Sequence, residues 1–109
     1  MVDKQKAQEE IQQITEIIKQ TVPVERIYLF GSHAYGTPHE RSDYDFFVVM
    51  PDGSMRPLDA TRAIHRALAH SPLRTPSDVM AMHKSRFELT SRYNTLERKV
   101  LRDGRLLYG

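Results

Sequence analysis

Two short apolar runs with polar chemistry at their ends constrain this chain more than any other feature. The runs are 27–30 and 46–50, and short apolar runs bounded by turn residues are typical of buried strands. A glycine and a serine end the first run, ten residues intervene, and two alternating aspartates open the second. These residues are Gly31, Ser32, Asp43 and Asp45. We therefore expect a phosphate-sized corner after one strand and two carboxylates at the head of the next.

The chemistry of these four residues suits a nucleoside triphosphate and its metals. Side chains two apart on a strand share a face roughly 7 Å apart, so Asp43 and Asp45 can converge on divalent ions. Mg²⁺ prefers such hard oxygen ligands, and two ions about 4 Å apart stabilise both oxygens of a displacement at phosphorus. Gly31 lets the backbone approach a phosphate, and Ser32 can donate a hydrogen bond to it from its hydroxyl.

A third carboxylate is expected to complete this metal cluster. Asp78 is the best candidate, because it starts the apolar run that follows, as Asp43 and Asp45 start theirs. Asp52 and Asp59 are poorer candidates, since one falls in a turn and the other on a helix. Tyr44 should face the opposite side and pack in the core.

The remaining pattern predicts an α+β fold, with one small sheet and helices packed on it. The predicted helices cover 3–21, 57–70 and 86–103, the last broken near 94–95, and the predicted strands cover 26–30, 43–50 and 77–82. At most a helical turn is expected between the first two strands.

Finer signals place the ends and faces of these helices. Ser85 and Glu88 form a capping-box pattern that starts the last helix near 86, and Gly104 suits its C-cap. Lys4, Lys6, Glu9 and Glu10 are interpreted as a solvated face of the first helix.

Composition limits what the chain can do. Its 109 residues indicate a single domain, 1–109, with no room for a second, substrate-binding one. The absence of cysteine excludes disulfide scaffolds and thiolate metal sites, and no apolar run reaches the roughly 20 residues of a membrane span. We expect a cytoplasmic protein. A net charge of +2 is weak support for nucleic-acid binding, which stays possible but is not favoured.

At these residues the chain resembles a minimal nucleotidyltransferase (MNT) domain of the DNA polymerase β superfamily. The segments 29–38 and 42–49 carry the likeness, with Gly31, Ser32, Asp43 and Asp45 matching the family's signature and Asp78 matching its third acidic residue by position. The C-terminal 101–108 resembles the closing helix and tail. The resemblance implies the family's small mixed β-sheet, similar to the polymerase β palm.

The resemblance also implies an activity and a partner. It implies magnesium-dependent transfer of a nucleoside monophosphate, AMP from ATP, with Asp43, Asp45 and Asp78 holding two Mg²⁺ ions and Gly31 and Ser32 holding the phosphates. Domains of this size resemble the antitoxin of HEPN–MNT toxin–antitoxin pairs, some of which adenylylate a tyrosine on a HEPN ribonuclease toxin. One departure is Tyr35, where many members carry arginine.

Two other functions stay open at this point. A non-catalytic antitoxin could act by steric contact, although an idle site has no need of three carboxylates that repel one another. An RNA-end nucleotidyltransferase could use the basic C-terminal stretch as its RNA tract. That stretch contains Arg92, Arg98, Lys99, Arg102 and Arg105. Its favoured interpretation is a solvated helix face, and the alternative is a docking patch for an acidic partner or a nucleotide. His33, His39 and Arg41 are further candidates for nucleotide contact.

Overall fold

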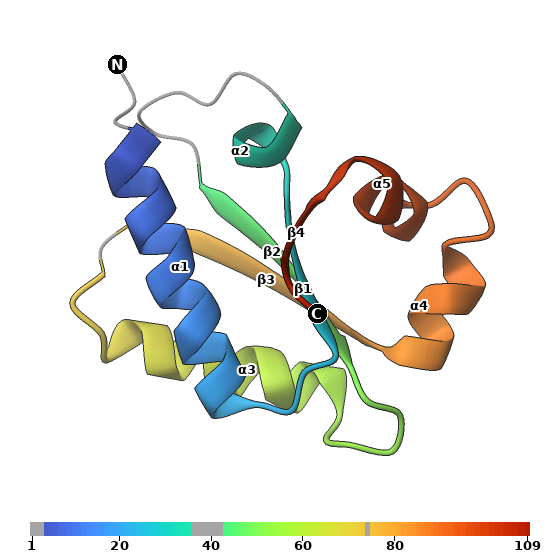
Figure 1. Ribbon diagram of the computed structural model, residues 1–109. Helices are drawn as coiled ribbons and strands as arrows, with labels where there is room; N and C mark the ends of the chain where they lie inside the picture. Colours follow the sequence, from blue (N-terminus) through green and yellow to red (C-terminus); the bar gives the residue numbers. More distant parts are fainter. Residues whose placement is uncertain (1–3, 36–42, 74) are drawn as a thin grey trace.

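One mixed sheet organises the molecule (Figure 1). The computed structural model describes residues 4–35, 43–73 and 75–109. Within them, four strands lie in the order β3-β2-β1-β4, and they are β1 Arg26–Phe30, β2 Tyr44–Met50, β3 Ser77–His83 and β4 Arg105–Tyr108. β1 is antiparallel to both β2 and β4, whereas β2 and β3 run parallel. The predicted central position of β2 is confirmed.

Helices cover both faces of this sheet. They are α1 Lys4–Thr21, α2 Ser32–Tyr35, α3 Pro57–Ala69, α4 Lys84–Thr90 and α5 Leu96–Asp103. α1 and α3 lie against one face, and α4 and α5 lie on the other, as Figure 1 shows. The predicted α+β fold, a small mixed sheet with helices packed on it, is confirmed. None of the helices in the described ranges combines the length and apolar character that a bilayer crossing demands.

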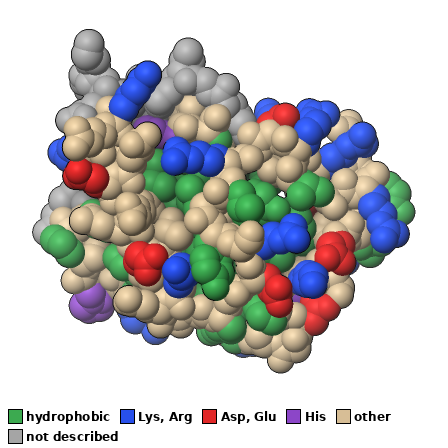
Figure 2. All heavy atoms as spheres, viewed as in Figure 1, with side chains coloured by type: hydrophobic (Ala, Val, Ile, Leu, Met, Phe, Trp, Pro, Cys, Tyr) green, Lys and Arg blue, Asp and Glu red, His purple; other side chains and the backbone are tan. Residues whose placement is uncertain are grey.

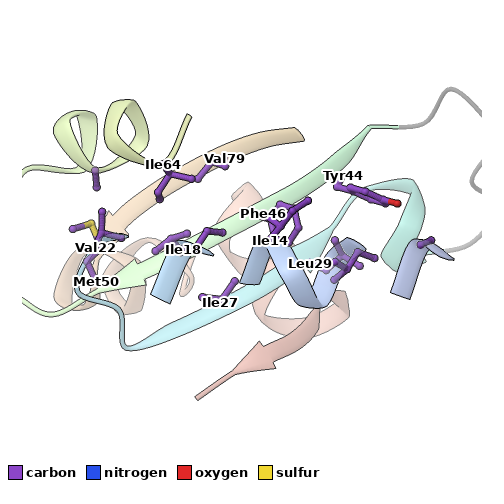
Figure 3. Close-up of a cluster of buried hydrophobic side chains, with 14 residues drawn as sticks. Ile14, Ile18, Val22, Ile27, Leu29, Tyr44, Phe46, Met50, Ile64 and Val79 are labelled. Carbon is purple, nitrogen blue, oxygen red and sulfur yellow. The ribbon is translucent and has the colours of Figure 1, made fainter. Parts of the chain in front are cut away.

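The larger core lies between the sheet and the α1–α3 layer (Figure 3). Alternate residues of β2 supply it, namely Tyr44, Phe46, Val48 and Met50. The helical stripe of α1 meets them with Ile11, Ile14 and Ile18, all at most 5% exposed. Burial of this face fixes the register of β2, so the intervening residues, which include Asp45, point to the opposite face.

A smaller cluster on that opposite face holds α4 and α5 to the sheet. It consists of Tyr28, Phe47, Val49, Phe87 and Val100. Phe87 is the buried residue of α4, and its ring lies 5.9 Å from that of Tyr28 and 5.3 Å from that of Phe47. This aromatic packing is what attaches α4 to the sheet.

The packing of Phe87 predicts a modest loss of stability when its ring is replaced by an aliphatic side chain. Phe87→Leu should lower the free energy of unfolding by about 1–1.5 kcal/mol, because an apolar side chain of similar volume fills most of the site but loses the ring contacts. Leu89→Ala on the same helix, where the side chain is 47% exposed, is the control and should change it by less than about 0.5 kcal/mol. Urea denaturation measures both, and equal effects would contradict this account of α4.

Of the two finer signals for the last helix, one is wrong and the other is confirmed. The Ser85–Glu88 capping box does not form, since α4 begins at Lys84 and its N-cap His83 makes no side-chain cap. Instead, the Asp52 carboxylate accepts two hydrogen bonds from Ser85. One comes from the Ser85 backbone nitrogen at 3.0 Å, and the other comes from the Ser85 hydroxyl. The predicted C-cap is confirmed, because Gly104 ends α5 and its nitrogen donates to the Val100 carbonyl at 2.9 Å. With φ −68° and ψ 157°, Gly104 is extended and leads into β4, a strand that the sequence did not indicate.

Candidate active site

Parallel pairing brings two of the predicted carboxylates side by side. Asp45 on β2 is the register partner of Asp78 on β3, and residues paired in this way project to the same face. Asp43 comes directly before β2, two residues from Asp45 along the chain. Asp43 and Asp78 are exposed, whereas Asp45 is half-buried. The starts of β2 and β3 therefore place Asp45 and Asp78 together on the α4–α5 side of the sheet, with Asp43 beside them in sequence.

Gly31 is fitted tightly against one of these carboxylates. Phe30, the last residue of β1, pairs with Asp45. The chain therefore leaves the sheet at Gly31, next to the Asp45 side chain. Its φ of +76° lies in the left-handed region that glycine adopts without steric cost. A Cβ atom here would overlap Oδ2 of Asp45 and lie 3.0 Å from its Cγ. The Asp45 carboxylate thus occupies the space that a side chain at position 31 would need, so only glycine fits there.

The serine after this glycine opens a short helical turn. α2 begins at Ser32, which is exposed, and the Ala34 nitrogen donates to the Gly31 carbonyl at 3.0 Å. The predicted helical turn between β1 and β2 is therefore present. His33 lies next to it, with its ring 4.6 Å from that of Tyr44. His39 and Arg41 lie outside the described residues.

Burial and two neighbouring negative charges act on Asp45. Burial raises the pKa of Asp45 above its usual range, and the negative charges of Asp78 and Asp43 raise it further, whereas His33 acts in the opposite sense. A carboxylate in such surroundings is stabilised by any cation that joins it. The negative charges of Asp78 and Asp43 are therefore close enough to act on Asp45.

The donor set fits a divalent metal by its chemistry. Three carboxylates supply the hard oxygen ligands that Mg²⁺ prefers, and burial together with the negative charges of Asp78 and Asp43 raises the pKa of Asp45. In residues 4–35, 43–73 and 75–109, no three His, Cys, Asp or Glu side chains already converge into a metal-binding group.

A hydrogen-bonded group that the sequence did not reveal lies behind the site. Glu10 of α1 accepts a hydrogen bond from Tyr44 at 2.8 Å and bonds from the Thr75 hydroxyl at 3.1 and 3.0 Å. Burial and the bond to Glu10 raise the pKa of Tyr44 to about 12. The interpretation of Glu10 as part of a solvated face is wrong, although its spacing from Ala7 and Ile14 on the apolar stripe was a signal. Tyr44 packs in the core as predicted, with 3% exposed.

The basic C-terminal residues lie on the surface. Arg92, Arg98, Lys99, Arg102 and Arg105 are all exposed. Figure 2 shows lysine and arginine side chains on the side formed by α4 and α5, interspersed with acidic and apolar ones. Arg102 is paired with its neighbour Asp103 at 3.1 Å. A docking role for these residues stays a prediction.

Solved structures share this architecture. A nucleotidyltransferase from Sulfolobus solfataricus, described as putative, matches 88% of this chain and 74% of its own, with TM-score 0.59 and 21% identity. A toxin–antitoxin structure with AMP-PNP matches 89% and 71%, with TM-score 0.55 and 26% identity. The MntA–HpeT toxin–antitoxin, as a mutant with two Asp-to-Glu changes, matches the same shares with TM-score 0.53 and 24% identity. No curated protein matches the chain significantly.

The family follows from a match that includes the whole site. The model of the polymerase β nucleotidyltransferase family matches residues 12–109, from the middle of α1 through β4. That span contains the corner at Gly31 and all three aspartates. This chain belongs to the polymerase β nucleotidyltransferase family.

Proposed function

We propose that the chain is a single minimal domain that transfers a nucleoside monophosphate, AMP from ATP, with magnesium as cofactor. The observation that carries the proposal is the pairing of Asp45 with Asp78 beside the glycine corner at Gly31. Asp43, Asp45 and Asp78 would hold Mg²⁺, which when bound stabilises charge on the reacting phosphate oxygens. Gly31 and Ser32 would bind the β- and γ-phosphates, where backbone and hydroxyl donors suit phosphate oxygens.

The proposed reaction is an in-line displacement at the α-phosphorus. The acceptor hydroxyl oxygen bonds to this phosphorus, the bond to the bridging oxygen of the β-phosphate breaks, and pyrophosphate leaves. Asp78 takes the hydroxyl proton, for which its exposed carboxylate at the strand start is accessible. Positioning and charge stabilisation supply most of the catalysis in such transfers.

The acceptor in this proposal is a hydroxyl of a partner protein, a HEPN ribonuclease toxin, and the chain is its antitoxin in the cytoplasm. Two features support this choice. The chain has 109 residues, with little surface beyond the sheet and its helices to enclose a small acceptor. Two of the similar structures are of toxin–antitoxins, one with AMP-PNP, and the aspartates changed in the other have the spacing of Asp43 and Asp45.

Label transfer tests the proposal directly. The chain is incubated with α-labelled ATP, Mg²⁺ and the product of the neighbouring gene, and label should pass to that protein and disappear when EDTA removes the metal. Label on added RNA instead would point to the RNA-end enzyme. Neutralisation of the partner without ATP or Mg²⁺, and with no label transferred, would leave the non-catalytic binding module and overturn the proposal.

A further inference from the structure

A single carboxylate on α1 bridges two segments that are distant in the sequence. Glu10 accepts a hydrogen bond from the Tyr44 hydroxyl at 2.8 Å, and Tyr44 lies 34 residues away in the sequence. The Thr75 hydroxyl, 65 residues away, lies 3.1 and 3.0 Å from the two oxygens of the same carboxylate. Tyr44 is 3% exposed and Glu10 is half-buried, so bulk water competes weakly for these contacts. Hydrogen bonds to an ionised acceptor are stronger than neutral ones.

These two segments are the ones that carry the aspartates. Tyr44 stands between Asp43 and Asp45, and Thr75 precedes Asp78 by three residues. The Tyr44 nitrogen also donates to the Pro76 carbonyl at 3.1 Å, where the parallel pairing of β2 and β3 begins. Figure 3 shows the Tyr44 ring at one end of the buried cluster, with its hydroxyl oxygen directed away from that cluster. Glu10 thus fastens the starts of both strands to one helix.

The bridge acts from behind the site. The Tyr44 side chain points to the α1 face of the sheet, while Asp45 and Asp78 lie on the other face. Glu10 therefore cannot reach a nucleotide bound at the aspartates. Its effect is on the spacing of two strand ends whose carboxylates repel each other, at a place where sheet pairing starts and local opening costs least.

We infer that Glu10 is a positioning residue, which through Tyr44 and Thr75 holds Asp45 and Asp78 at the separation that a divalent cation requires. The inference rests on the proposed function, because it assigns a metal to these aspartates. Hydrogen-bonded groups behind metal ligands fix ligand orientation, and their loss weakens metal affinity about tenfold or more. Glu10→Ala removes both hydrogen bonds. Glu10→Gln can keep them, since its amide oxygen accepts from Tyr44 and its amide nitrogen can donate to Thr75.

Two measurements on the full chain test the inference, with Glu9→Ala as the matched control. Glu9 is exposed and adjacent, so its loss removes the same charge from α1 without touching the bridge. Amide hydrogen exchange, followed by NMR, should be about tenfold faster at Tyr44 in Glu10→Ala and unchanged at the amides of β1. Binding of Mn²⁺, read from the free-ion EPR signal, should weaken about tenfold in Glu10→Ala. Glu10→Gln and Glu9→Ala should resemble the wild type in both.

The outcomes separate this inference from the proposed function. A wild type that binds no Mn²⁺ overturns the assignment of a metal site, and the inference falls with it. A wild type that binds Mn²⁺ as tightly as Glu10→Ala does overturns the inference alone. Equal acceleration of exchange at Tyr44 and at the β1 amides would make Glu10 a residue of general stability, which also overturns it. Affinity in Glu10→Gln as weak as in Glu10→Ala would assign the effect to the charge of Glu10 and not to its hydrogen bonds, which also overturns the inference.

Discussion

Asp45→Asn is expected to lower the rate of nucleotide transfer about 10³-fold while leaving the fold as stable as before, or more stable. Loss of a ligand removes several kcal/mol of charge stabilisation, and each 1.36 kcal/mol corresponds to a factor of ten in rate. Stability behaves differently because the burial of Asp45 raises its pKa, and the negative charges of Asp78 and Asp43 raise it further. Its charged form is therefore unfavourable in the folded protein at neutral pH. The neutral amide of Asn carries no charge to bury and is not repelled by Asp78 and Asp43.

Thermal unfolding with and without Mg²⁺ and AMP-PNP separates these effects. The wild type should gain melting temperature when both are added, because ligands that bind the folded state stabilise it. Asp45→Asn should gain little. Asp59→Asn is the control, since Asp59 is an aspartate on α3 paired with Arg56 at 2.9 Å on the surface. It should transfer at the wild-type rate and keep close to wild-type stability, because exposed ion pairs contribute little. A wild-type rate in Asp45→Asn would refute the metal-binding role.

The elements that sequence predicted well are those with a strong local pattern. The helix over 3–21, the strand over 26–30 and the helix over 57–70 match α1, β1 and α3 within a residue at each end. β4 escaped notice because Arg105–Tyr108 is short and has no β-branched residue. What makes it a strand is its pairing with β1, almost eighty residues earlier in the chain.

In the candidate site too, the residues of a local motif were predictable from the sequence, and those placed by distant contacts were less so. Gly31, Ser32, Asp43 and Asp45 form a local motif, so their neighbourhood could be read from spacing alone. The parallel register that sets Asp78 opposite Asp45 is a tertiary property, which the sequence could suggest only through the position of each aspartate at the start of a run. Glu10 was misassigned for the same reason, because both of its partners are distant in the sequence.

Gly31→Ala is the second large effect expected, and it tests the geometry of the corner instead of its charge. The new Cβ would overlap Oδ2 of Asp45 and lie 3.3 Å from its Cβ. The end of a side chain can rotate away at low cost in stability, but the carboxylate then leaves its place. Displacement of a catalytic group by about 1 Å can cost 10²-fold in rate. We therefore expect transfer to fall about 100-fold.

Gly53→Ala provides the matched control for this change. Gly53 has the same φ of +76°, yet a Cβ atom there would meet nothing within 4 Å. Both variants should lose about 1–2 kcal/mol of unfolding free energy, the usual cost of a side chain in the left-handed region. Only Gly31→Ala should lose activity and Mg²⁺-dependent nucleotide affinity. Both variants share the backbone strain, and only Gly31→Ala has the clash with Asp45. Equal transfer rates in the two variants would therefore mean that the position of Asp45 against Gly31 does not matter for the reaction.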